Sequence, residues 1–215
     1  MGERSVGDFI LWFVVFLFSL SLHEAAHAWT ANRFGDSTAF YLGRVTLNPL
    51  RHIDPLGTIV FPIINFLFRV PLIGWAKPVP VNTAHLRNVR RSHILISLAG
   101  PASNLLLAII FLILLKLFLV SMDSGGDWLG TRFAVPLYKM LVAGLFLNVS
   151  LAVFNFIPIP PLDGHWLLYH LLPSHAAAAF DQLRPYGFLV LYAMMFTGVF
   201  SYIFAPANWL IRQVL

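Results

Sequence analysis

Four long apolar stretches, separated by short polar connections, dominate the pattern of hydrophobic and polar positions along the chain. They cover residues 9–29, 94–120, 135–157 and 186–204. Each is close to the roughly 20 mostly apolar residues that a helix needs to cross the hydrocarbon core of a bilayer. The pattern therefore predicts an all-α polytopic membrane protein with about four full transmembrane helices.

A fifth apolar stretch, residues 57–68, is too short for a full span, and Pro62 lies inside it. Backbone polar groups at membrane depth need partners within the protein, so we expect a re-entrant or short membrane segment here. We also expect small β elements in the connections. Because no internal repeat or appended soluble domain is visible, residues 1–215 are predicted to form a single intramembrane domain.

The composition agrees with a membrane protein, since 59% of the residues are hydrophobic and only 11% are charged. The net charge of +5 is not arranged as a basic stripe with interleaved aromatic residues, so we expect no nucleic-acid partner. The absence of cysteine excludes disulfides, thiolate ligands and a cysteine nucleophile. The first stretch resembles a cleavable signal peptide, but Glu3 and Asp8 cancel the expected positive charge, and we expect it to be retained.

Basic residues concentrate in the two connections on either side of residues 57–68. They are Arg33, Arg44 and Arg51 in the first, and Lys77, Arg87, Arg90 and Arg91 in the second. Connections rich in Lys and Arg stay on the cytoplasmic side, which requires residues 57–68 to enter and leave the membrane on that side. Residues 121–132 are then expected outside the cell and the segment around Asp163 inside.

The sequence "SLHEAAHAW", residues 21–29, places three ionisable groups in the first apolar stretch. In a helix, His23 and His27 project from one face and suit a single tetrahedral Zn²⁺. Glu24 is rotated by about 100° from His23 and would serve as a general base rather than a ligand. Ionisable groups inside a membrane helix are costly and call for a functional reason. The alternative is a polar patch where the helix meets the headgroups.

A third zinc ligand is expected in "NFIPIPPLDGHW", where Asp163 follows three prolines. Those prolines prevent a regular helix, so we expect extended backbone before Asp163 and a sharp turn at Gly164. The alternative makes Asp163 the cap of the helix that follows. With the charge-based topology, Asp163 and His27 end on the same side of the membrane and can share one metal.

These motifs together resemble the site-2 protease family of intramembrane zinc metalloproteases. The resemblance is carried by "HEAAH" and "NFIPIPPLDG", and also by "SLAGPASNLLLA" at 97–108 and "GRVTLNPLRHIDPLGTI" at 43–59. It implies zinc bound by His23, His27 and Asp163, with Glu24 as the catalytic base. It also implies that Asn155, and more remotely Asn104, helps to hold the substrate or the oxyanion.

The resemblance further implies a multi-pass protein of the cell membrane whose active site faces the cytoplasm. Its substrate would be the transmembrane segment of another protein, held in the lipid bilayer. We expect a compact form without the PDZ or CBS domain that many relatives use for regulation. His52 is expected to pack within the fold. His165 is two residues from Asp163 and could approach the site, but the sequence does not assign it a role.

Two other classes of function are compatible with a polar cluster in a membrane helix. A metal-ion transporter would need a continuous polar path, and no second intramembrane acid cluster is visible. A non-catalytic membrane scaffold would not need Glu24 beside the histidines. The sequence does not identify the substrate or the oligomeric state.

Overall fold

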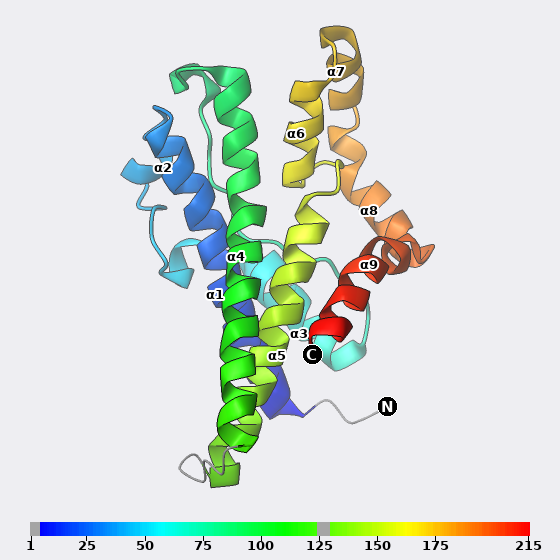
Figure 1. Cartoon of the computed structure of the whole chain (residues 1–215). Coiled ribbons are helices and arrows are strands. Elements are labelled where there is room, and N and C mark those ends of the chain that lie inside the picture. The colour runs from blue at the N-terminus through cyan, green and yellow to red at the C-terminus, as the bar shows by residue number, and fades with distance from the viewer. Residues whose placement is uncertain (1–4, 124–129) are drawn as a thin grey trace.

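The computed structural model describes residues 5–123 and 130–215 of the chain (Figure 1). Three long helices form its centre: α1 (Val6–Arg33), α4 (Val89–Asp123) and α5 (Gly130–Asn155). Shorter helices surround them: α2 (Thr38–Tyr41), η1 (Pro49–Arg51), η2 (Pro55–Val60), α3 (Phe61–Phe68), η3 (Thr83–His85), α6 (Asp163–Leu171), α7 (Ser174–Asp181), η5 (Arg184–Tyr186), α8 (Gly187–Phe196) and α9 (Val199–Val214). The described part of the chain is thus all-helical, as expected.

The expectation of small β elements was wrong, since the described residues contain no strand. The connection between α3 and η3 is extended, but its N–H groups bond to scattered turns rather than to a second strand. Trp75 N–H donates to Gly57 O and Lys77 N–H donates to His52 O. Prolines at positions 71, 78 and 80 also remove donors that a strand ladder would need.

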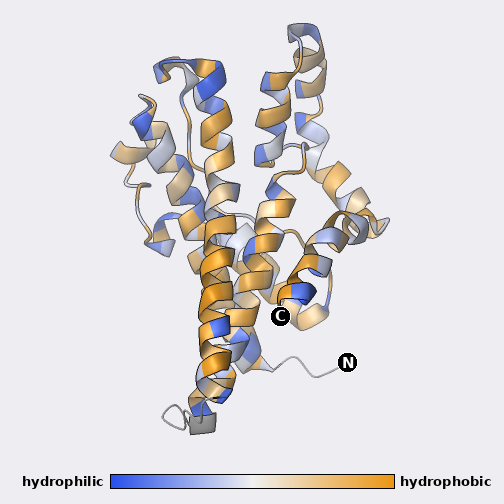
Figure 2. Ribbon diagram, viewed as in Figure 1, coloured by the Kyte–Doolittle hydropathy of each residue, from blue (hydrophilic) through white to orange (hydrophobic). Residues whose placement is uncertain are grey.

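The three long helices are apolar and long enough to cross a membrane. Figure 2 shows hydrophobic residues along much of α4, and large side chains there, including Leu106, Ile109 and Leu117, are exposed. A soluble protein rarely exposes so much contiguous apolar surface, whereas a bilayer would cover it. The chain is therefore a multi-pass membrane protein.

The last apolar stretch is interrupted where the hydropathy pattern predicts one helix over residues 186–204. The structure has two helices there, α8 and α9, separated by a short break. The helical segment Ser174–Phe196, which ends with α8, and α9 are bent by 72° at this break. Gly198 occupies the break with φ of +77°, a left-handed conformation that other residues rarely adopt. The stretch is therefore a bent pair rather than one straight helix, and it adds a fourth span to the three long helices only when the pair is counted as one span.

Residues 57–68 fall within a short apolar helical segment formed by η2 and α3. Pro62 does not interrupt it, because it lies in the first turn of α3, where a missing N–H costs little. The side chain of Asp54 caps the start of η2 by accepting from the N–H groups of Leu56 and Gly57. The segment is too short to span, and its re-entrant path remains a prediction.

Asp36, just after α1, is hydrogen-bonded to the connection before α4. Its fully buried carboxylate accepts from the N–H of Asn82 at 2.6 Å and of Thr38 at 3.0 Å, and also from the Thr38 hydroxyl. Burial alone would raise the pKa of Asp36, but the hydrogen bonds from Thr38 and Asn82, with a smaller one from His85, outweigh it. The pKa therefore lies below its ordinary value.

We expect Asp36→Asn to lower the free energy of unfolding at pH 7 by about 1–3 kcal/mol, because an amide leaves buried donors poorly paired. Since the pKa of Asp36 is lowered by folding, its stabilisation is present above about pH 4 and is lost as the pH falls through the folded value. Unfolding of both proteins in detergent across pH 3–7 checks this. A stability difference that stays constant over that range would contradict the prediction.

Candidate metal centre

Three side chains that the sequence singles out converge in the interior of the helix bundle. His23 and His27 lie on one face of α1, and Asp163 begins α6. The two Nε2 atoms are 3.1 Å apart, and Asp163 Oδ2 lies 3.2 Å from that of His23 and 3.3 Å from that of His27. Both histidines are buried. No other group of three such ligands converges in the part of the chain that the structure describes.

The other ring nitrogen of each histidine is held by an oxygen acceptor. His23 Nδ1 lies 2.6 Å from Asn104 Oδ1, and His27 Nδ1 lies 2.7 Å from the carbonyl oxygen of Ile96. An oxygen acceptor requires the proton on Nδ1, so each neutral ring presents a lone pair at Nε2. The two lone pairs therefore point toward each other and toward Asp163.

This arrangement fits a divalent cation. Asp163 Oδ2 is buried without a hydrogen-bond partner, and a carboxylate oxygen beside two lone pairs is repelled unless a positive charge lies among them. Two imidazole nitrogens and one carboxylate oxygen form a ligand set typical of catalytic zinc, which keeps a fourth position open. The residues present therefore suit Zn²⁺.

The capping alternative for Asp163 finds no support in the local geometry. Leu162 is the N-cap of α6, and no side chain caps that helix. The expectation of a sharp turn at Gly164 was also wrong, because Gly164 lies inside α6. A side chain there would collide with the backbone of Phe156, since its Cβ would lie 2.4 Å from Phe156 O. Gly164 thus allows α6 to start close to the end of α5.

Glycine 100 on α4 shapes the centre, and sequence reasoning missed it. A Cβ at this position would lie 2.3 Å from His27 Nε2 and 2.7 Å from His23 Nε2. Any side chain would therefore enter the space between the ligands. The only signal in the sequence was the glycine within "SLAGPASN", which carries no chemistry of its own.

Glutamate 24 lies beside the ligand group without belonging to it. Its side chain is buried, and Oε2 accepts a hydrogen bond from the N–H of Val79 at 3.2 Å. Val79 belongs to the extended connection between α3 and η3, which therefore passes next to the centre. A carboxylate held at one oxygen in this way is suited to proton transfer at the other.

The remaining candidate residues lie in different surroundings. Asn104 is fully buried behind His23, whereas Asn155 ends α5 and donates to Leu151 O of its own helix. His52 is buried and contacts Thr46 O, in agreement with a packing role. His165 is buried against Phe180, 3.5 Å from Asp181, and is not part of the ligand group.

We expect Gly100→Ala to remove most zinc binding while the protein remains folded. The added methyl group would occupy the space between His23 and His27, whereas alanine suits a helix interior. Zinc content of the purified variant and its helical circular dichroism check this. Leu105→Ala, on an exposed position of the same helix, is a control expected to keep its zinc. Full zinc content in Gly100→Ala would contradict the packing argument.

Comparisons with known proteins agree with this centre. Residues 11–198 match the model of Peptidase family M50. The chain is 38% identical over 193 residues to "Putative zinc metalloprotease YwhC" of Bacillus subtilis, covering 90% of this chain and 83% of that protein. It is 34% identical over 192 residues to "Putative zinc metalloprotease Rip2" of Mycolicibacterium smegmatis, covering 89% of this chain and 69% of that protein. No solved structure gives a significant match.

The segment that matches the family contains the three converging side chains and the three long helices around them, except for the first residues of α1. Neither a metal-ion transporter nor a non-catalytic scaffold is favoured by these findings. The chain belongs to peptidase family M50 and is a zinc metalloprotease of the site-2 protease type, embedded in a membrane by its apolar helices.

Proposed function

We propose that this protease cleaves peptide bonds in or near transmembrane segments of other membrane proteins, using His23, His27 and Asp163 as zinc ligands and Glu24 as general base. The observation that carries these roles is the convergence of three buried ligand atoms at 3.1–3.3 Å, with Glu24 next to them but outside the group. A structural polar patch would not need its lone pairs to face one another.

The chemistry divides between the metal and the protein. Zinc, when bound, supplies a Lewis acid that makes water a stronger nucleophile and polarises the scissile carbonyl. Glu24 takes a proton from the attacking water as the new C–O bond forms, then passes it to the leaving nitrogen as the C–N bond breaks. The Val79 N–H occupies Oε2 of Glu24, which leaves Oε1 for the proton transfer.

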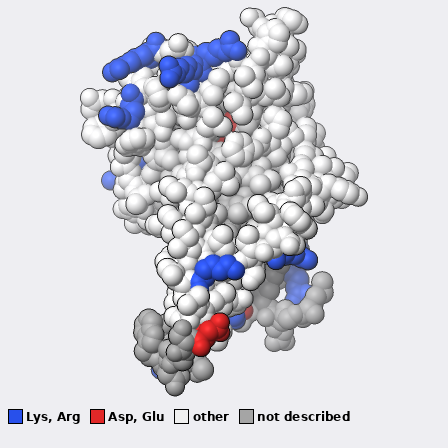
Figure 3. All heavy atoms as spheres, in the orientation of Figure 1, with Lys and Arg blue, Asp and Glu red and all other residues white. Residues whose placement is uncertain are grey.

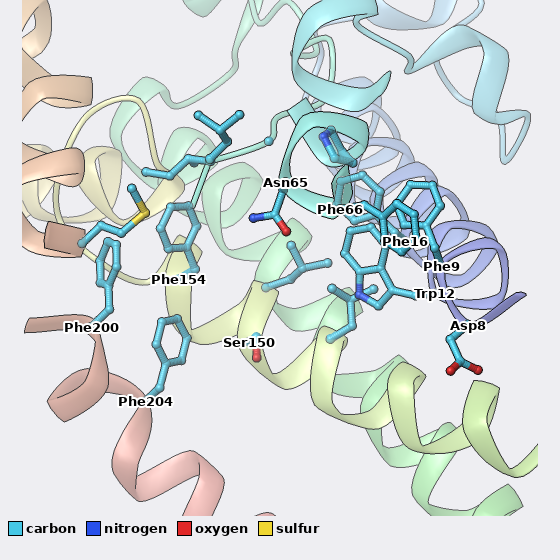
Figure 4. A pocket seen from close by; sticks show the side chains of 17 residues that line it. Asp8, Phe9, Trp12, Phe16, Asn65, Phe66, Ser150, Phe154, Phe200 and Phe204 are labelled. Carbon is cyan, nitrogen blue, oxygen red and sulfur yellow. The ribbon is translucent and has the colours of Figure 1, made fainter. Parts of the chain in front are cut away.

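An apolar cavity offers a place for the substrate to approach. It has a volume of about 620 Å³ and lies between α1, α3, α5 and α9, with aromatic side chains around it (Figure 4). Its wall includes residues 72–74, the start of the same extended connection that reaches Glu24 through Val79. A substrate segment in the cavity would therefore lie alongside backbone that leads to the catalytic base.

The distribution of charge supports an active site on the cytoplasmic side of the cell membrane. Figure 3 shows Lys and Arg side chains gathered at the end of the molecule where α4 begins, and a second set toward the opposite end. The end of α1 and the start of α6 lie toward the same end (Figure 1). Positively charged connections remain cytoplasmic, so the zinc ligands are closer to that face.

We expect Thr83→Cys to resist a membrane-impermeant thiol reagent in intact cells, because the connection before α4 is proposed to be cytoplasmic. The chain has no cysteine of its own, so any label reports this position. Ser124→Cys lies in the predicted outer connection, which falls partly outside the described residues, and should be labelled. Labelling of Thr83→Cys from outside would overturn the proposed topology.

We expect Glu24→Gln to abolish cleavage of a reconstituted transmembrane substrate while about one zinc per chain stays bound, since glutamine cannot accept the proton. Cleavage is followed on gels, and zinc is measured in the same purified sample. Loss of zinc in the variant would make Glu24 a ligand. Cleavage at the normal rate would exclude Glu24 as the base.

A further inference from the structure

A chain of buried side chains leads from the metal centre through all three long helices. His23 Nδ1 lies 2.6 Å from Asn104 Oδ1 on α4, and Asn104 Nδ2 donates to Asn148 Oδ1 on α5 at 2.9 Å. Asn148 Nδ2 donates to Ser19 Oγ at 2.9 Å and to the carbonyl oxygen of Gly144 at 2.8 Å. Ser19 is one helical turn before His23 on α1, so the chain closes on the helix where it starts.

These polar groups are cut off from water, so their pairing has to be complete within the protein. Ser19, Asn104 and Asn148 each have 0% exposure. A buried amide without hydrogen-bond partners is strongly destabilising. Because a flipped amide would lose the partners that it has, those partners fix its orientation. The orientation of each asparagine is thus decided by its neighbour rather than by solvent.

The backbone carbonyl of Gly144 fixes which groups donate and which accept along this series of hydrogen bonds. A carbonyl can only accept, so the NH₂ group of Asn148 has to face it, and Oδ1 of Asn148 has to face Asn104. Asn104 then turns its NH₂ group toward Asn148 and its oxygen toward His23. His23 consequently carries its proton on Nδ1 and leaves a lone pair on Nε2 for the metal.

The orientation of His27 does not depend on such a series of side-chain hydrogen bonds. His27 Nδ1 donates to the carbonyl oxygen of Ile96, which is part of the backbone and cannot exchange a donor for an acceptor. The partner of His23 is an amide, which would present NH₂ to the ring if it flipped by 180°. The ring would then hold its proton on Nε2 and could not bind the metal. Only His23 therefore needs a residue that prevents the flip.

We propose that Asn148 is a positioning residue for the metal centre, which prevents Asn104 from flipping and so keeps His23 in its metal-binding tautomer. This inference rests on the proposed role of His23 as a zinc ligand. Asn104 then acts behind His23 rather than on the substrate or the oxyanion, and Asn148 acts through Asn104 without touching either zinc or substrate.

The test measures how Asn148→Leu changes zinc affinity in two proteins, one with Asn104 and one with Asn104→Asp. Asn148→Leu should weaken zinc binding by about 10-fold or more, the usual lower bound when a partner behind a metal ligand is lost. In Asn104→Asp, the carboxylate has only acceptor atoms, so a flip changes nothing for His23. Adding Asn148→Leu to Asn104→Asp should therefore cause no further loss of zinc affinity.

Chelator competition measures zinc affinity in purified protein that also carries Glu24→Gln. Proteolysis plays no part, so this result stands apart from any failure of the proposed cleavage. Ser21→Ala is the matched control, because Ser21 is equally buried on α1 but donates to Leu17 O of its own helix. It should keep its zinc affinity.

Nitrogen-15 spectra of the histidine rings in zinc-free protein supply a second readout. In Asn148→Leu, His23 should shift toward the form with its proton on Nε2, while His27 stays unchanged. A loss of zinc affinity that is equal in both Asn104 backgrounds, or an unchanged His23 tautomer, would overturn the proposal. If Asn148→Leu does not fold, Asn148→Ser replaces it in the same measurements of zinc affinity and His23 tautomer.

Discussion

The structure depends on the close approach of three electron-rich atoms in the interior of a membrane protein. Two imidazole nitrogens and a carboxylate oxygen lie 3.1–3.3 Å apart, with both histidines buried and Asp163 partly buried. Such a group repels itself at low dielectric unless a cation lies within it. The long helices, the start of α6 and the absence of a side chain at Gly100 all serve to hold this group in place.

Three helices together position the three proposed ligands. α1 supplies both histidines, α4 holds their Nδ1 atoms through Asn104 and Ile96, and α6 brings the carboxylate. α5 contributes no ligand, yet it orients Asn104 and delivers the chain to Asp163. The rigidity of the centre thus comes from contacts between helices rather than from any one motif.

The extended connection after α3 joins Glu24, the proposed catalytic base, to the charged end of the molecule. Val79 N–H binds Glu24, and three residues later Asn82 N–H binds the buried carboxylate of Asp36. Prolines on both sides of Val79 keep this backbone extended, so its N–H cannot be drawn into a helix. A segment without regular secondary structure can therefore hold the base in a defined position.

The sequence by itself determined the membrane class and the three long helices, because hydropathy is a local property. It also singled out His23, Glu24 and His27 by their helical spacing, and Asp163 by its place in a recognisable motif, as the candidate site. It did not determine the bend at Gly198, the helical path through Pro62 or the crowding at Gly100, which depend on backbone geometry and on neighbours distant in the chain. Nor could it place Asn104 behind His23, because residues 81 positions apart meet only when α1 packs on α4. Spacing along a helix shows which side chains share a face, whereas their partners and proton positions are decided by tertiary packing.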